Sequence, residues 1–299
     1  SPDSKKISYV DNGRNLYVID IATGSISKVD SDDLYVPGPF RNLLGSWSFD
    51  SKWIAYTKVT ETNFKRIYLY ALDQNKSFAL TDGLSDASEP TFDPSGKYLY
   101  FLASTDAGPV VNWFDLSNAD MRMTNSIYLV TLQKETISPF ARESDEEVAK
   151  KEDAEANKDK KDTSKPEKKV DNLKIDLDGI ENRIVDIPIK AGNFSSLGIG
   201  KEEELLYIER ESGMLHKYDL KKRRDSEVME MDDYVISADG KKMLYVKGDT
   251  FGITATGEKT EPGKGILNLA EVKIKIDPLA EWPQICEEAW RINRDYFYD

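Results

Sequence analysis

The chain has 299 residues, and its 39% hydrophobic and 32% charged residues are typical of a folded protein with a sizeable core. Its net charge of −13 repels phosphate backbones, which excludes nucleic acid as an expected partner. No stretch approaches the roughly 20 apolar residues of a membrane span, residues 1–4 show no signal-peptide pattern, and the single cysteine, Cys286, excludes internal disulfides and cysteine-based metal clusters.

A short marker recurs along the chain. Each copy begins with a polar turn of Asp, Ser, Gly or Lys residues and continues into a short apolar strand. The copies are residues 2–10, 49–57, 94–102, 200–208 (a degenerate copy) and 238–246. A second apolar segment follows the marker at residues 16–20, 67–70, 127–130 and 215–218. We therefore expect several short strands in each repeat.

The spacing of the markers indicates the fold class. The first three recur about every 45 residues, and a period of about 40–45 residues with several strands per unit is typical of β-propeller blades. Stacked helical repeats have similar periods, but these segments are β-branched, aromatic and too short for helices. The five markers predict an all-β fold of about five antiparallel blades of four strands each, beginning near residues 7, 54, 99, 205 and 243. Propellers have about four to eight blades, so a complete and an incomplete ring both stay open.

Two long segments interrupt the repeat. Residues 106–124 include Trp113 and Phe114 and are expected to form an ordered excursion that covers the propeller face, with a docking patch as the alternative. Residues 143–171 contain no aromatic residue, Leu or Ile and are expected to be a solvated charged linker, with a partner-binding tail as the alternative. Blades 1–3 are then expected within residues 1–142, and the remaining blades within residues 172–276.

The last segment changes character. Asp277 followed by Pro278 is a typical helix start. Ile285, Ala289 and Ile292 then recur on one helical face. Residues 277–299 are therefore expected to open a C-terminal helical domain, and the chain is expected to be a segment of a longer protein.

Three stretches carry a resemblance to a known family. The marker, with its Asp-Ser/Gly-Lys turn, resembles the propeller repeats of TolB and of tricorn-type peptidases. Residues 175–185 (IDLDGIENRIV) look like the blade that follows a charged insertion in tricorn homologues. Residues 281–299 resemble the opening helix of their helical domain, and this stretch is the most specific of the three.

The resemblance implies a parent serine peptidase that acts on peptides. The parent would also contain a helical domain, a PDZ domain and an α/β domain with the serine nucleophile, so the partners of this segment are peptide substrates and the other domains. The segment itself is expected to be inactive, to carry no catalytic, cofactor or metal site, and to gate or channel peptides. The resemblance favours a periplasmic over a cytoplasmic location, which stays open. A non-enzymatic TolB-like scaffold and the propeller of a prolyl-oligopeptidase-type enzyme are the alternatives.

Few residues invite a catalytic or binding interpretation. His216, the only histidine, occupies the repeat position of a packing tyrosine, and no Gly-x-Ser-x-Gly elbow occurs. Asp176, Asp178 and Glu181 suggest a calcium loop, but their spacing does not match an EF-hand, so turn and strand-edge roles are favoured. Arg183 could contact a peptide carboxylate, but a structural ion pair with a neighbouring acid is the favoured interpretation.

Overall fold

The computed structural model describes residues 1–34, 43, 45–106, 122–141, 172–200, 204–259 and 263–296. The chain divides into two compact units, Ser1–Gly265 and Ile266–Asp299, and the division falls before the boundary that the sequence predicts at residue 277. The predicted linker, residues 143–171, and most of the predicted excursion, residues 107–121, lie outside the described residues.

The first unit consists of five antiparallel sheets, each a meander of consecutive strands, which we call blades 1 to 5 in chain order. Blade 1 contains β1 (Lys6–Val10), β2 (Asn15–Asp20) and β3 (Ile26–Ser31). Blade 2 contains β4 (Ser46–Trp47), β5 (Trp53–Val59), β6 (Lys65–Ala71) and β7 (Lys76–Ala79). Blade 3 contains β8 (Asp86–Phe92), β9 (Tyr98–Ser104), β10 (Ser126–Thr131) and, after the 3-10 helix η3 (Ile180–Arg183), β11 (Ile184–Asp186). Blade 4 contains β12 (Phe194–Ile199), β13 (Glu204–Glu209), β14 (Met214–Asp219) and β15 (Arg224–Glu230), and blade 5 contains β16 (Asp233–Ile236), β17 (Lys242–Lys247) and β18 (Thr250–Ala255).

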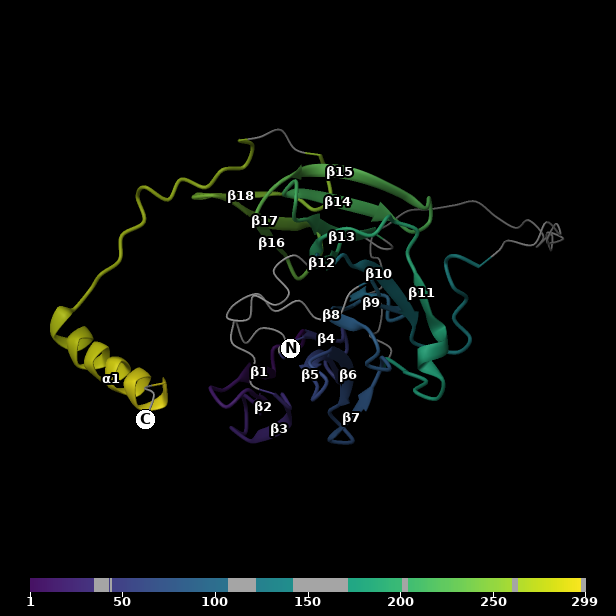
Figure 1. The fold of residues 1–299 in the computed structure, drawn as a ribbon. Helices are drawn as coiled ribbons and strands as arrows, with labels where there is room; N and C mark the ends of the chain where they lie inside the picture. The colour runs from purple at the N-terminus through teal and green to yellow at the C-terminus, as the bar shows by residue number, and fades with distance from the viewer. Residues whose placement is uncertain are drawn as a thin grey trace, which may run out of the picture. The chain divides into compact units, whose positions relative to one another are not determined.

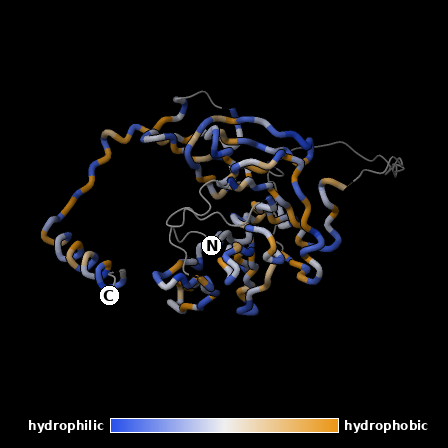
Figure 2. Tube along the Cα trace, in the orientation of Figure 1, coloured by the Kyte–Doolittle hydropathy of each residue, from blue (hydrophilic) through white to orange (hydrophobic). Residues whose placement is uncertain are grey.

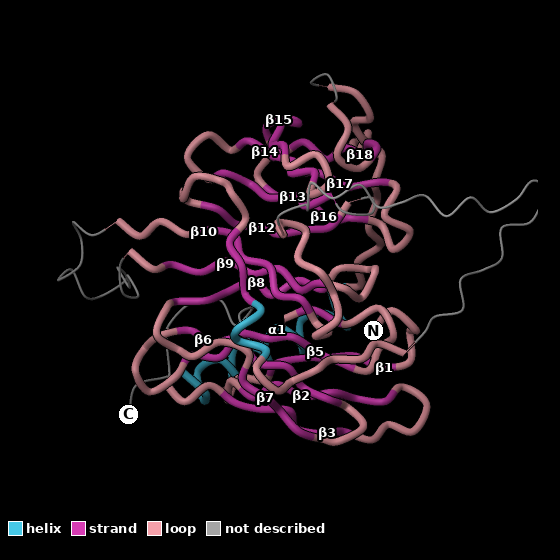
Figure 3. Tube along the Cα trace, turned by 90° about the vertical axis from the view of Figure 1, so that its right-hand side faces the viewer, coloured by secondary structure: helices cyan, strands magenta, loops and turns pink. Residues whose placement is uncertain are grey.

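The blades follow one another in space as they do in sequence (Figures 1 and 3). A separate apolar cluster fills each interface between successive blades. The largest side chains of these clusters include Tyr56, Phe101, Tyr207 and Tyr218. Figure 2 shows that apolar residues occur in all five blades and are not concentrated in one of them. The predicted all-β propeller class is therefore confirmed, and the described blades form a series that does not close into a ring.

The markers lie in equivalent strands, but one expectation about them is wrong. They occupy β1, β5, β9, β13 and β17, and in blades 2 to 5 this is the second strand. Those blades therefore begin one strand earlier than predicted, and blades 1 and 5 have three described strands each instead of four. The first strands are short or polar, as in the two-residue β4, so they lack the apolar pattern that identifies a strand in a sequence.

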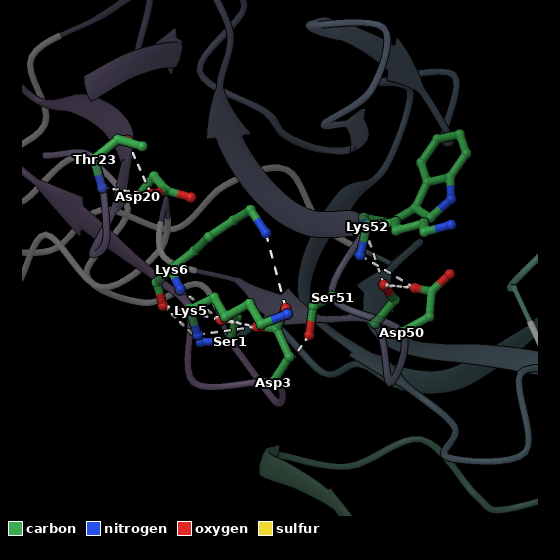
Figure 4. A network of polar contacts seen from close by, with 11 residues as sticks. Ser1, Asp3, Lys5, Lys6, Asp20, Thr23, Asp50, Ser51 and Lys52 are labelled. Carbon is green, nitrogen blue, oxygen red and sulfur yellow. Dashed lines mark hydrogen bonds and ion pairs between the residues drawn. The ribbon is translucent and has the colours of Figure 1, made fainter. Parts of the chain in front are cut away.

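A network of polar contacts explains the marker turn (Figure 4). In blade 2, the Ser48 hydroxyl donates to Asp50 at 2.6 Å and accepts the Trp53 backbone N–H at 2.9 Å. Ser51 adopts a left-handed conformation with a φ of 60°, and Ser4, Gly96 and Gly240 do so at the equivalent positions. The Asp3 N–H also donates to the Ser51 hydroxyl at 3.1 Å, which joins the turns of blades 1 and 2.

The second unit contains the predicted C-terminal helix, α1 (Pro278–Tyr296). The Asp277 carboxylate caps its first turn by accepting the Leu279 N–H at 3.2 Å. Trp282, Ile285 and Trp290 are exposed on this helix. No helix among the described residues has the length and hydropathy that a membrane-spanning helix needs.

Candidate functional site: the inner strands of the blades

The first strands of blades 2 to 5 form the innermost row of the array (Figure 1). Each of β4, β8, β12 and β16 contacts the next one along the row. The outermost strands β7, β11 and β15 lie on the far side of their blades. Because the inner row runs across four blades, it is the surface on which residues from different blades can meet.

Two strands of the inner row carry a β-bulge at the same repeat position. The register shifts between Ser88 and Thr91 in β8, and between Ser195 and Gly198 in β12. Within these bulges Glu89 and Ser196 adopt left-handed conformations, with φ values of 53° and 55°. Non-glycine residues rarely adopt this conformation, and bulges of this kind re-aim side chains near functional surfaces.

The bulge of blade 3 binds the bulge of blade 4 through Glu89. Its carboxylate accepts the Leu197 backbone N–H at 3.0 Å. The side chain is exposed, yet desolvation raises the pKa of the Glu89 carboxyl, and this effect exceeds the opposing hydrogen bonds and the positive charges of Arg210 and Lys65. Both observations fit a carboxylate in a concave surface, where neighbouring blades displace much of the water without covering the group.

The chain of polar contacts continues from blade 4 to blade 5. The Ser196 hydroxyl donates to Asp233 at 3.3 Å, and the Tyr234 hydroxyl donates to the Ser196 carbonyl at 2.6 Å. A Cβ at Gly198 would lie 2.6 Å from the Tyr234 hydroxyl, so this glycine makes room for the tyrosine. The inner ends of three blades are thus tied together by Glu89, Ser196 and Tyr234.

A groove of about 430 Å³ crosses the same three inner strands. It is lined by residues of β8, β12 and β16 and of the turn after β8. The lining combines apolar side chains, such as Phe92, Ile199 and Val235, with the polar Ser196 and Asp233. Its volume is within the range of ligand pockets, about 300–1,000 Å³, and apolar side chains beside strand backbone are suited to an extended peptide. We take the inner-strand groove as the candidate functional site.

His216 occupies the repeat position that the sequence predicts. It pairs across the sheet with Tyr207 and stacks on it, with ring centroids 5.1 Å apart. The pairs equivalent to this one are Tyr9–Tyr17, Tyr56–Tyr68 and Phe101–Tyr128, which also stack. Its Nδ1 lies 2.8 Å from Asp225, which also accepts the Tyr207 hydroxyl at 3.0 Å. The packing interpretation of His216 is therefore confirmed.

The acidic residues before β11 organise a turn. The Asp176 carboxylate accepts the Lys134 backbone N–H at 3.0 Å, and Asp178 pairs with the Lys134 ammonium at 2.7 Å. Arg183 donates to the backbone carbonyls of Thr131, Asp176 and Asp178, so its described hydrogen bonds differ from the ion pair that the sequence predicts. Glu181 lies in η3. No group of three or more His, Cys, Asp or Glu side chains in the described part of the chain could hold a metal ion.

Sequence reasoning missed the residues of the inner-strand groove. Glu89, Ser196 and Asp233 lie outside the markers, in strands that the apolar pattern does not reveal. Glu89 and Leu197 are 108 residues apart in the chain, so no local signal predicts their contact. The four strands of each predicted blade were counted from the marker, so the strand that precedes the marker was missed.

Comparison with known proteins places the chain among tricorn propellers. Residues 1–257 match the family described as "Tricorn protease second beta propeller domain". The whole chain aligns with 27% of the length of a tricorn protease homolog from Saccharolobus solfataricus, at 25% sequence identity. It aligns with 28% of the length of the tricorn protease from Thermoplasma volcanium, also at 25% sequence identity. The chain thus spans about a third or less of the length of the curated relatives it matches.

Solved structures show the same fold. The crystal structure of the tricorn protease is similar over 100% of this chain and 28% of that chain, with a TM-score of 0.73 and 20% identity. The structure of TolB from Acinetobacter baumannii is similar over 86% of this chain and 51% of that chain, with a TM-score of 0.53 and 15% identity.

Proposed function

Because the chain belongs to the family of tricorn protease second β-propeller domains, we propose that it is a non-catalytic segment of a serine peptidase and guides peptide substrates. The nucleophile, its histidine partner and the oxyanion groups then lie in other domains of the parent protein. In this role the segment gates or channels peptides toward those domains.

The inner-strand groove is the observation that carries the proposal. It crosses three blades, and its lining of apolar side chains and strand backbone suits an extended chain better than a folded surface. A folded protein cannot follow such a groove, so the blades would act as a sieve for unfolded peptides. The net charge of −13 would favour neutral or basic peptides through an attraction that salt screens.

The chemistry of the described residues supports an inactive segment. The single histidine stacks on Tyr207 and contacts the Asp225 carboxylate. A serine nucleophile needs a neighbouring base within hydrogen-bond reach, and the described polar contact of His216 is with a carboxylate instead of a hydroxyl.

A scaffold role is the second candidate, and the similarity to TolB favours it. In that case the propeller face would bind a protein partner, and removing the blades would not alter peptide selectivity. The match to the tricorn family over residues 1–257 makes the peptidase segment the preferred proposal.

A truncation of the parent protein tests the proposal. The parent and a well-folded version without these blades are compared on a short chromogenic peptide and on a folded, protease-sensitive protein. Sieving predicts that the truncation gains activity on the folded protein and keeps its activity on the peptide. Unchanged selectivity in a truncation with a native circular dichroism spectrum would leave the blades only a bracing or scaffold role.

A further inference from the structure

A second hollow, of about 380 Å³, lies at the interface between blades 2 and 3. It is lined by the segment between β7 and β8, by β9 and β10, and by residues of η3 and β11. The hollow includes Ser85, just before β8 begins, whereas the inner-strand groove includes Thr91 and Phe92, where β8 ends. The two features are therefore separate and lie at opposite ends of the same strand.

One wall of the hollow is aromatic. It is formed by Phe101 and Tyr128, which face each other across β9 and β10 and stack with ring centroids 5.6 Å apart. Two residues further along the same strands, Ala103 and Ser126 form the next cross-strand pair, and Ala103 lines the hollow. Among the described residues, no cation lies over the ring of Tyr128. The hollow thus opens where the strands next to the aromatic pair carry small side chains.

Blade 2 fills the equivalent space with its own cations. The equivalent of Tyr128 is Tyr68, and the next cross-strand pair consists of Lys58 and Arg66. The Lys58 ammonium and the Arg66 guanidinium lie 5.8 and 5.6 Å from the centroid of the Tyr68 ring. Arg66 also donates through Nε to the Thr81 carbonyl. Blade 2 therefore shows that this position of the repeat accommodates a cation over an aromatic ring.

Carboxylates accompany the aromatic ring in both blades. In blade 2 the Lys58 ammonium pairs with Asp30 at 3.1 Å and with Asp33 at 2.9 Å, and both acids come from the end of the preceding blade. In the hollow, Asp82 likewise follows the last strand of the preceding blade, and Glu181 of η3 adds a second acid. Neither of these two acids forms an ion pair with a described residue. The hollow thus repeats the arrangement of blade 2 without its cation.

The lining specifies the ligand. An ammonium ion is attracted both to the face of an aromatic ring and to carboxylates. The buried Ala103 and the half-buried Ile184 supply apolar surface beside them, which suits an apolar stem that carries the charge at its tip. A lysine side chain combines these features.

We propose that the hollow between blades 2 and 3 binds the side chain of a lysine that a peptide presents. Asp82 and Glu181 bind the ammonium, and the ring of Tyr128 contacts it through a cation–π interaction. The choice of lysine rests on the comparison with blade 2, whereas the choice of a peptide as its carrier rests on the proposed function. The site would add a preference for lysine-containing peptides at a surface separate from the inner-strand groove.

Binding to the chain measures this preference without proteolysis. The probe is an N-terminally fluorescein-labelled peptide of Gly and Ser with one central lysine, followed by fluorescence anisotropy at low salt. The comparison peptide carries norleucine, which has the same apolar stem without the ammonium. We expect the lysine peptide to bind about tenfold more tightly, since the cation–π contact and the ion pairs both require the charge.

Two acid-to-amide variants separate the site from general charge. Asp82→Asn keeps an acceptor for the Leu84 N–H, which the Asp82 carboxylate binds at 2.9 Å, and should lose most of the lysine preference. Asp249→Asn changes the net charge by the same amount on an exposed residue of blade 5 and should keep the preference.

A cation supplied by the chain itself should block the hollow. Ala103→Lys places a lysine at the position that Lys58 occupies in blade 2, so it should abolish the lysine preference. Ser27→Lys, on the exposed outermost strand of blade 1, adds the same charge and should leave the preference intact. If Ala103→Lys does not fold, Asp82→Asn still tests the site.

Three results would each overturn the proposal. They are equal affinity for the lysine and norleucine peptides, no measurable binding of the lysine peptide up to about 1 mM, and the same preference in Asp82→Asn as in Asp249→Asn. A failed sieving test with an intact, Asp82-dependent preference would overturn the proposed function alone.

Discussion

Glu89 links blades 3 and 4 at the inner row through a hydrogen bond to the backbone of Leu197. A left-handed glutamate in a bulge is costly by itself, of the order of 1–3 kcal/mol. Its carboxylate offsets part of this cost by accepting the Leu197 N–H at 3.0 Å. The same carboxylate is desolvated, which raises its pKa. The contact therefore orders the groove wall but makes the native state sensitive to the ionisation of Glu89.

Glu89→Gln should remove this sensitivity. The raised pKa means that the unfolded state ionises first as pH rises through the ordinary glutamate value of 4.5, so the wild type loses stability between that pH and the raised native pKa. Glutamine keeps an acceptor for the Leu197 N–H and carries no charge. The stability of the variant relative to wild type should therefore increase across this window, as measured by urea unfolding at a series of pH values.

Glu209→Gln is the control of opposite sign. Hydrogen bonding from Ser212 lowers the pKa of Glu209, so its charge stabilises the native state above the ordinary glutamate pKa, and this contribution is lost on acidification. The deficit of Glu209→Gln should thus shrink as pH falls. Parallel pH profiles for Glu89→Gln and wild type would contradict the desolvated-carboxylate account.

The role of a single residue could be predicted where other blades carry a similar residue at the same repeat position. His216 was predicted as a packing residue because Tyr17, Tyr68 and Tyr128 occupy its position in other blades, and the stacking on Tyr207 confirms it. Glu89 and Ser196 follow no repeat in residue type. Their roles depend on bulge geometry and on contacts between blades, neither of which leaves a periodic pattern in the sequence.

At the scale of strands and blades, the marker strand and its partner form the constant part. Each blade pairs the same two positions across these strands, and four blades fill them with stacked rings. In blade 5 the pair is Tyr245 with Gly252. A Cβ at Gly252 would lie 2.3 Å from the tyrosine ring, so the ring occupies the space that a second side chain fills elsewhere.

Gly252→Ala should therefore destabilise the chain although alanine favours a strand no less than glycine does. The added methyl group must displace the Tyr245 ring, and overpacking of this kind costs about 1–3 kcal/mol in the free energy of unfolding. Gly200→Ala is the matched control, because its Cβ would make only ordinary contacts, the nearest at 3.4 Å. Equal unfolding midpoints in urea for the two variants would contradict this account of blade 5.

The strands that the sequence predicted are more apolar than the strands that it missed. β5 and β9 are buried along most of their length and carry the marker, so their sequences identify them. β4 has two residues, and β8 contains Glu89 and Pro90, so neither shows an apolar alternation. Each inner strand pairs with the marker strand of its own blade and contacts at least one neighbouring inner strand, so its structure depends on these contacts more than on its own sequence.

The molecule as a whole is a series of blades with an apolar core at each interface. The period of the markers predicted this architecture because each blade buries the same apolar strands against its neighbours. It did not predict the inner-strand groove, which exists only after three blades stand side by side. The proposed function belongs to this scale, since no single blade could guide a peptide.

Narrowing the inner-strand groove in the full-length parent protein tests whether peptides pass along the inner strands. Val235 is 67% exposed in the groove, so Val235→Trp should fill space that a peptide needs without disturbing a core. Ser27→Trp, on the exposed outermost strand of blade 1, is the control. If peptides follow this groove, Val235→Trp lowers kcat/KM for a long unfolded peptide by about tenfold and leaves kcat/KM for a short chromogenic peptide unchanged. Ser27→Trp changes neither value. Equal values for Val235→Trp and wild type on the long peptide would contradict guidance of substrates along the inner strands.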